Sequence, residues 1–159
     1  MRGIKATWIN TDPNSKCKMN IKEEVVNVFQ QEFGFLSKKF EIIDLLGNNR
    51  PLDIETIKNL KLPYPKKNLV WHPGVYVFIG NGTVYRVGRS LTNSRKRVLE
   101  HLTDRTSFNN VGVWDIEDFP DKAILLFNLI DKEDIHWLAA LEIFLERKYS
   151  PKIPSGRLG

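Results

Sequence analysis

One carboxylate stands where the chain is otherwise apolar. Of the nine residues 137–145, only Glu142 is not apolar, and at helical spacing it shares a face with Leu138 and Leu145. A buried carboxylate without a partner costs several kcal/mol, so Glu142 requires a cation. That cation is either an arginine in a structural ion pair or a single Mg²⁺ ion, whose remaining ligands are waters.

Three further side chains suit phosphodiester hydrolysis. Arg97 and His101 are four residues apart in a predicted helix that starts near residues 92–94, so they share one face. A guanidinium binds phosphate oxygens, and an imidazole binds phosphate or moves a proton. Tyr76 offers a phenol that acts as a general base if nearby cations lower its pKa. The alternative assignments are a core tyrosine, a solvated arginine and a surface histidine.

The order of these residues resembles a known nuclease family. A GVY triplet at 74–76 is followed by a predicted hairpin, an RVG triplet at 86–88, the Arg97 helix, and a later helix with Glu142. This arrangement resembles the GIY-YIG nucleases over residues 73–154. The resemblance implies that Tyr76 activates water, Arg97 stabilises the pentacovalent phosphate, and Glu142 holds a single Mg²⁺ (or Mn²⁺) ion near the leaving 3′ oxygen.

The chain departs from the family pattern at three places. Arg86 stands where the second triplet has its tyrosine, and Tyr85 comes one residue earlier. In a regular strand Tyr85 faces away from Arg86, and only a bulge would bring it round as a catalytic residue. The loop over residues 88–97 is about one residue longer than is typical of the family. Pro154 stands where an asparagine is usual.

A basic block lies around the same motifs. Residues 86–105 carry six bases and two acids, whereas residues 106–142 carry two bases and eight acids. We predict that four of these bases bind a DNA backbone, helped by donors at the helix N-terminus: Arg86, Arg89, Arg95 and Lys96. A solvated basic surface is the alternative. Trp71 and His72 either line the cleft or pack the connector.

The first part of the chain is expected to be helical. Residues 20–46 keep an apolar spacing close to that of a helix, with a break at Gly34, and a short helix capped by Asp53 follows over residues 53–60. Three prolines in residues 61–73 predict an extended connector.

The pattern then changes to strands. Residues 75–79 and 83–87 are rich in β-branched and aromatic side chains, and Asn81-Gly82 between them predicts a tight hairpin turn. Residues 122–130 predict an apolar strand central in a sheet, and Asp134 is expected to cap a final helix over residues 135–149.

We therefore expect an α+β fold: a small, mostly antiparallel three-stranded sheet flanked by helices. Residues 1–72 form a helical N-terminal region with its connector, and residues 73–159 form the nuclease-like domain.

Composition excludes other classes. The chain has 159 residues, 42% of them hydrophobic, and a formal charge of +5. It has no apolar run long enough to cross a membrane, and its first residues lack the apolar segment of a secretory signal. A lone cysteine, Cys17, excludes an internal disulfide, and the three histidines lack zinc spacing. An intracellular protein is expected.

The sequence predicts a metal-dependent DNA endonuclease, of restriction type or from a repair or mobile-element setting. A non-cleaving nucleic-acid-binding module with the same fold is the alternative, supported by Arg86 and Pro154. A protein-interaction domain would fit the acidic residues 106–142 but not the arginine cluster.

Overall fold

The sheet is built around the predicted hairpin. A computed structural model describes residues 20–48 and 50–156, and Cys17 lies outside them. Strands β2 (Gly74–Gly80) and β3 (Thr83–Ser90) pair antiparallel, and the turn between them is Asn81-Gly82. Both turn residues have positive φ, 51° and 65°, as a two-residue hairpin turn requires. The hairpin prediction is confirmed.

The sheet has four strands, so the three-stranded prediction is wrong. The apolar strand β6 (Ala123–Leu129) is central as predicted, in the order β1-β6-β2-β3, with every pair antiparallel. The additional strand is β1 (Phe40–Asp44), within a segment predicted to be helical. Its sequence, FEIID, contains two adjacent β-branched residues, and its pairing covers an edge of β6 that would otherwise be open.

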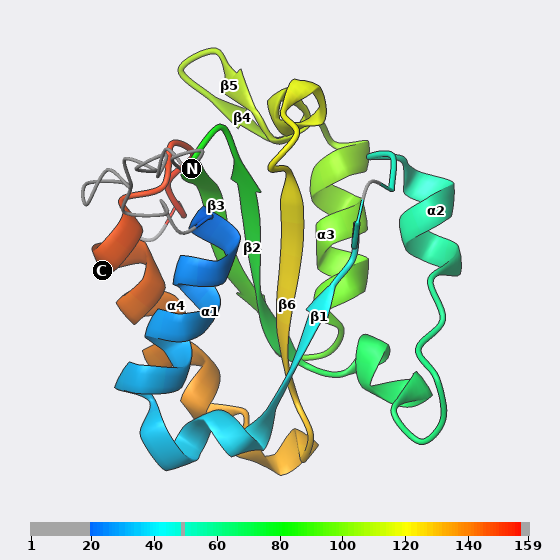
Figure 1. The fold of residues 1–159 in the computed structure, drawn as a ribbon, viewed down its shortest axis with the longest axis vertical. Helices are drawn as coiled ribbons and strands as arrows, with labels where there is room; N and C mark the ends of the chain where they lie inside the picture. The colour runs from blue at the N-terminus through cyan, green and yellow to red at the C-terminus, as the bar shows by residue number, and fades with distance from the viewer. Residues whose placement is uncertain (1–19, 49, 157–159) are drawn as a thin grey trace, which may run out of the picture.

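Helices cover both faces of this sheet (Figure 1). On one face, α1 (Ile21–Glu32) and α4 (His136–Tyr149) pack on a core that includes Val75, Val77 and Phe127. On the other face, α2 (Ile54–Asn59) and α3 (Ser94–Thr103) enclose a core that includes Tyr76 and Phe78. Alternation along β2 therefore directs Tyr76 toward α3, as the sequence predicted.

Most of the helix boundaries are explained by residues that cap or interrupt a helix. Asp53 and Asn93 cap α2 and α3 through their side chains, and Gly34, at φ +46°, separates α1 from the 3₁₀ turn that follows it. The predicted cap of α4 is wrong: Asp134 instead forms an ion pair with Lys39 at 2.9 Å, and α4 begins after Ile135.

Short elements complete the chain. The 3₁₀ turns are η1 (Gly34–Lys39), η2 (Lys67–Trp71), η3 (Val113–Asp118) and η4 (Lys132–Asp134). A two-stranded ribbon joins β4 (Ser107–Phe108) to β5 (Val111–Gly112). In the part of the chain described, none of the helices has both the length and the apolar character needed to cross a bilayer.

Candidate active site

Tyr76 lies across the backbone of the neighbouring strand. It pairs with Gly88 in the β2–β3 ladder, and its side chain is only 2% exposed. A Cβ on Gly88 would lie 2.2 Å from the Tyr76 hydroxyl oxygen and 2.4 Å from Cζ. The glycine of the second triplet is therefore needed to make room for the phenol of the first.

Replacing Gly88 with alanine is expected to destabilise the fold. The tyrosine ring is rigid and buried, so it must leave its position, and overpacking of this kind costs about 3 kcal/mol. Urea unfolding measures the loss. Gly156→Ala is the matched control, because a Cβ there meets nothing within 4 Å. Equal stability of the two variants would contradict the proposed packing.

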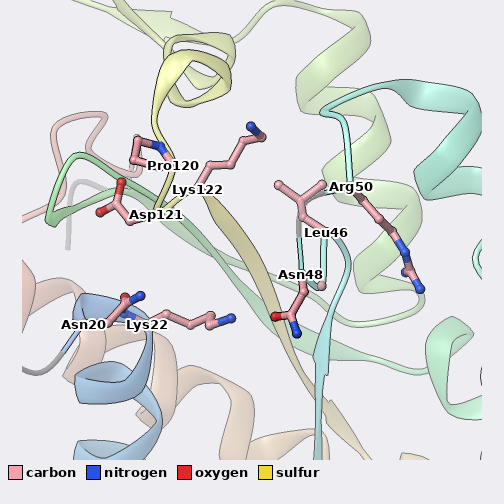
Figure 2. Close-up of a pocket in the computed structure, with 9 residues that line it drawn as sticks. Asn20, Lys22, Leu46, Asn48, Arg50, Pro120, Asp121 and Lys122 are labelled. Carbon is pink, nitrogen blue, oxygen red and sulfur yellow. The ribbon is translucent and has the colours of Figure 1, made fainter.

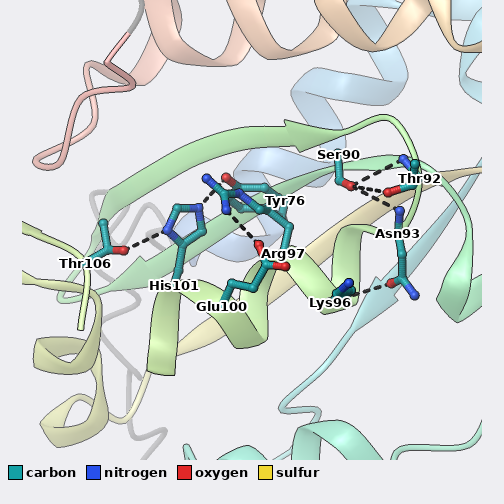
Figure 3. A network of polar contacts seen from close by, with 9 residues as sticks. All are labelled: Tyr76, Ser90, Thr92, Asn93, Lys96, Arg97, Glu100, His101 and Thr106. Carbon is teal, nitrogen blue, oxygen red and sulfur yellow. Dashed lines mark hydrogen bonds and ion pairs between the residues drawn. The ribbon is translucent and has the colours of Figure 1, made fainter. Parts of the chain in front are cut away.

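The Tyr76 hydroxyl belongs to a short polar chain (Figure 3). Tyr76 Oη lies 2.6 Å from His101 Nε2, and His101 Nδ1 lies 2.8 Å from Thr106 Oγ1. The histidine is 4% exposed, so both of its ring nitrogens are used inside the protein. With the proton on Nδ1 donated to Thr106, Nε2 is left to accept the proton of the Tyr76 hydroxyl.

Two arginines act on this chain electrostatically. Burial raises the pKa of Tyr76, and the positive charges of Arg86 and Arg97 oppose that rise. The condition set by the sequence analysis, that nearby cations lower the pKa of Tyr76, is therefore not met, because desolvation of the buried phenol outweighs the two cations. Burial, with Arg86 and Arg97 in addition, lowers the pKa of His101 to about 4. Near neutral pH the pair is thus a neutral phenol beside a neutral imidazole.

Stability should fall with acid because of His101. Its pKa drops from 6.5 to about 4 on folding, so the unfolded chain binds the proton more tightly. The stabilisation is complete above pH 6.5 and is lost as the pH falls toward 4, by about 3 kcal/mol in total. Urea unfolding between pH 7 and pH 4 measures it, with His101→Asn as reference. A variant with the same pH dependence as the wild type would contradict this prediction.

Arg97 forms an ion pair with another residue of its own helix, α3. Its Nη1 donates to Glu100 Oε2 at 2.7 Å, and the Arg97 side chain is 46% exposed. The guanidinium therefore reaches both solvent and the Tyr76 hydroxyl (Figure 3). Arg86, on β3, donates from Nη1 to the carbonyl of Pro154 at 3.2 Å, while its buried Nε has no hydrogen-bond partner among the described residues.

A buried network fixes the start of α3 to the sheet. Ser94 Oγ donates to Asn128 Oδ1 at 2.5 Å, and Asn128 Nδ2 donates to the carbonyl of Leu69 at 2.7 Å. A Cβ on Gly74 would lie 2.0 Å from that Asn128 oxygen, which explains the glycine of the first triplet. The network sets the position of the helix that carries Arg97 and His101.

A bulge changes the position of Tyr85. Phe78 pairs with Arg86 but Ile79 pairs with Val84, so Tyr85 has no partner on β2. Tyr85 consequently enters the core on the Tyr76 side, and the predicted regular alternation is wrong at this point. Its hydroxyl lies 3.5 Å from Lys152 Nζ, which also stands over its ring. The Tyr85 hydroxyl thus lies beside Lys152, whereas the Tyr76 hydroxyl lies beside His101.

Glu142 is separated from this group. It is 1% exposed, and its Oε2 accepts from Arg89 Nη1 at 2.8 Å. Arg89 pairs with Val75 in the ladder, so alternation places it on the α4 face of the sheet, opposite Tyr76. The structure therefore shows the arginine partner that was one of the two alternatives for Glu142.

The arrangement of Glu142 does not fit a hydrated Mg²⁺ ion. Such an ion keeps several waters and needs a carboxylate oxygen that water can reach, whereas Glu142 is buried and faces a guanidinium. Within residues 20–48 and 50–156, no three His, Cys, Asp or Glu side chains come together as a metal site.

The basic block divides into two groups. Lys96 is exposed on α3, and Arg86 is half-buried beside Tyr76. Arg95 is 8% exposed and donates to the Leu60 carbonyl at 3.1 Å, and Arg89 holds Glu142. Lys96 and Arg86 can therefore contact a phosphate backbone, whereas Arg89 and Arg95 form bonds inside the protein.

Sequence reasoning missed two contributors. Thr106 follows α3 in a turn and gave no motif signal, although its hydroxyl lies 2.8 Å from His101 Nδ1 and holds the orientation of the ring. Asn128, a polar residue within an apolar strand, was the available signal for the buried network. His72 packs in the connector, with Nδ1 2.8 Å from the carbonyl of Leu129.

A polar pocket beside the hairpin turn is separate from this site (Figure 2). It encloses about 280 Å³. Three of its charged side chains have partners: Lys22 pairs with Asp44 at 3.1 Å, Asp121 accepts from the backbone of Asn81 and Gly82, and Lys122 donates to the carbonyl of Glu117 at 3.0 Å. These internal bonds indicate a structural role for the pocket.

Comparison with known proteins gives no match: no family model, no curated protein and no solved structure is significantly similar to this chain.

Proposed function

We propose that this protein is a DNA endonuclease that hydrolyses phosphodiester bonds at Tyr76. The observation that carries the proposal is the 2.6 Å contact between the Tyr76 hydroxyl and His101, with Arg86 and Arg97 both acting on it. Two guanidinium groups next to a proton-transfer pair suit a phosphate better than a neutral ligand.

In the proposed reaction, Arg86 and Arg97 bind the non-bridging oxygens of the scissile phosphate. A water attacks phosphorus and gives its proton to Tyr76 Oη as Tyr76 gives its own to His101 Nε2. The P–O3′ bond breaks, and the leaving oxygen takes a proton from solvent. Burial, and after it the charges of Arg86 and Arg97, lower the pKa of His101 and oppose its protonation in the free protein. The negative charge of the bound phosphate offsets the contribution of the two arginines.

A non-cleaving nucleic-acid-binding module is the second candidate. The enclosed Glu142–Arg89 pair favours it, because the carboxylate that the family resemblance assigns to Mg²⁺ is engaged elsewhere. The same arginines would then bind a phosphate backbone without hydrolysing it.

Incubation with supercoiled plasmid separates the two candidates. We expect conversion to nicked and linear DNA in Mg²⁺, and a parallel incubation with chelator tests the metal dependence that the resemblance implies. Cleavage in chelator would remove the metal from the proposal but keep the hydrolase. Binding without cleavage in Mg²⁺ or Mn²⁺ would leave the binding module.

The salt dependence of DNA affinity tests which basic residues contact the DNA. Each phosphate contact contributes about 0.9 to the slope of log affinity against log salt, so Arg86→Gln/Lys96→Gln should reduce that slope by about two. Lys38→Gln/Lys148→Gln is the control, because both lysines are exposed on elements outside the basic block. An unchanged slope in the double variant would place the DNA on another surface.

A further inference from the structure

A second hollow lies between α2, the proline-rich connector and α3. It encloses about 510 Å³, within the range of small-ligand pockets. It shares none of its residues with the Tyr76 site. The residues lining it that matter here are Lys58, Lys61, Lys67, Trp71 and Arg95.

An aromatic ring is presented in this hollow. Trp71 is 49% exposed, although large aromatic side chains usually bury most of their surface. The Arg95 guanidinium carbon lies 5.4 Å from the centre of the indole, and Arg95 is itself buried and bonded to the Leu60 carbonyl. Arg95 therefore supports one face of the indole and leaves the rest of the ring available.

The charge of the hollow is entirely positive. Its lining includes three lysines and an arginine, and no acidic side chain. Lys58 pairs with Glu55 at 3.7 Å, but Lys61 and Lys67 have no carboxylate within 4 Å in the described part of the chain. Both lysines are exposed, so they can meet an anion.

We propose that this hollow binds an unpaired nucleotide of a single nucleic-acid strand, with its base stacked on Trp71 and its phosphates held by Lys61 and Lys67. Aromatic rings beside a cationic groove bind single strands in this way, because every base has a face that stacks. A base within a duplex is already stacked on its neighbours and cannot use Trp71 without leaving the helix.

The hollow is joined to the candidate active site through α3. Arg95 and Arg97 are two residues apart on that helix, and Arg95 faces the hollow while Arg97 reaches Tyr76. Residues two apart on a helix point to opposite sides, so the hollow and the Tyr76 site lie on opposite sides of α3. The inference rests on the proposed function only in taking nucleic acid as the ligand, since binding here does not require cleavage.

Binding of a fluorescent oligothymidylate of about ten nucleotides to the full chain, in chelator, tests the proposal. Trp71→Ala should weaken binding by about 10- to 100-fold, and Trp71→Phe by less, because phenylalanine still stacks. Phe35→Ala, which removes another exposed aromatic, is the control and should bind like the wild type. Thermal unfolding checks that each variant is folded.

The lysines provide a second test that leaves the aromatic packing intact. Lys61→Ala/Lys67→Ala should lower the salt slope for the single strand by about 1.4, since each phosphate on a single strand contributes about 0.7. Lys38→Ala/Lys148→Ala removes two exposed lysines from other elements and should leave the slope unchanged.

Three outcomes would overturn the inference. They are wild-type single-strand affinity in folded Trp71→Ala with an unchanged salt slope in the double lysine variant, an equal loss of affinity for a duplex of the same length in Trp71→Ala, and tighter binding of oligoglutamate than of the single strand at equal salt. The last would indicate an acidic peptide as the ligand. Plasmid cleavage is scored separately: loss of single-strand affinity at Trp71 with cleavage absent throughout would support this site and refute the nuclease.

Discussion

Tyr76→Phe is expected to lower the rate of plasmid cleavage by about 100-fold or more, the usual scale for removing a group that transfers the proton. The substitution deletes the hydroxyl that lies 2.6 Å from His101 Nε2 and keeps the ring that fills the space over Gly88. Single-turnover cleavage at saturating enzyme measures the effect on the chemical step, and DNA affinity should change little because Arg86 and Arg97 remain.

Tyr85→Phe is the matched control. Tyr85 is also a buried tyrosine on the same side of the sheet, but its hydroxyl lies near Lys152 rather than His101. Loss of the Tyr85 hydroxyl should change the rate of plasmid cleavage only slightly. A larger effect at Tyr85 than at Tyr76 would contradict the proposed site and assign the chemistry to the tyrosine that the bulge brings round.

Thr106→Val provides a test of the role of His101. Thr106 does not reach Tyr76 in the network described, so it acts by holding the imidazole with Nε2 toward the phenol. We expect a slower rate and a shifted pH–rate profile, with serine at the same position restoring both. Rescue by serine would not be expected if Thr106 only filled space.

Arg89→Met is expected to destabilise the fold by about 3 kcal/mol, because it removes the cation from a carboxylate that is 1% exposed. Glu142→Leu should cost less than about 1 kcal/mol, since the Arg89 side chain is 26% exposed and can turn its charge to solvent. The two losses of stability are expected to differ because the Glu142 carboxylate is buried, whereas the Arg89 guanidinium is partly exposed.

Urea unfolding of both single variants and of Arg89→Met/Glu142→Leu measures this pair. The double variant should recover most of the stability lost in Arg89→Met, because no buried charge remains. If Arg89→Met unfolds like the wild type, other groups stabilise the carboxylate. If Glu142→Leu keeps full cleavage activity, Glu142 is a structural residue and not a metal ligand.

The hairpin, the capped helices and the central strand could be predicted from the sequence because their signals are local. Asn81-Gly82 allows two positive φ angles in succession, Asp53 and Asn93 can cap a helix, and residues 123–129, apolar except for Asn128, suit a strand covered on both faces. Helical spacing of four likewise put Arg97 and His101 on one face.

The tertiary structure alone decided which surfaces meet. Residues 40–44 fit a helix and a strand equally well by spacing, and the open edge of β6 selected the strand. The bulge at Tyr85 depends on how β3 pairs with β2. Glu142 required a cation, but only the packing of α4 on β3 chose Arg89, because contacts between distant segments leave no mark in local spacing.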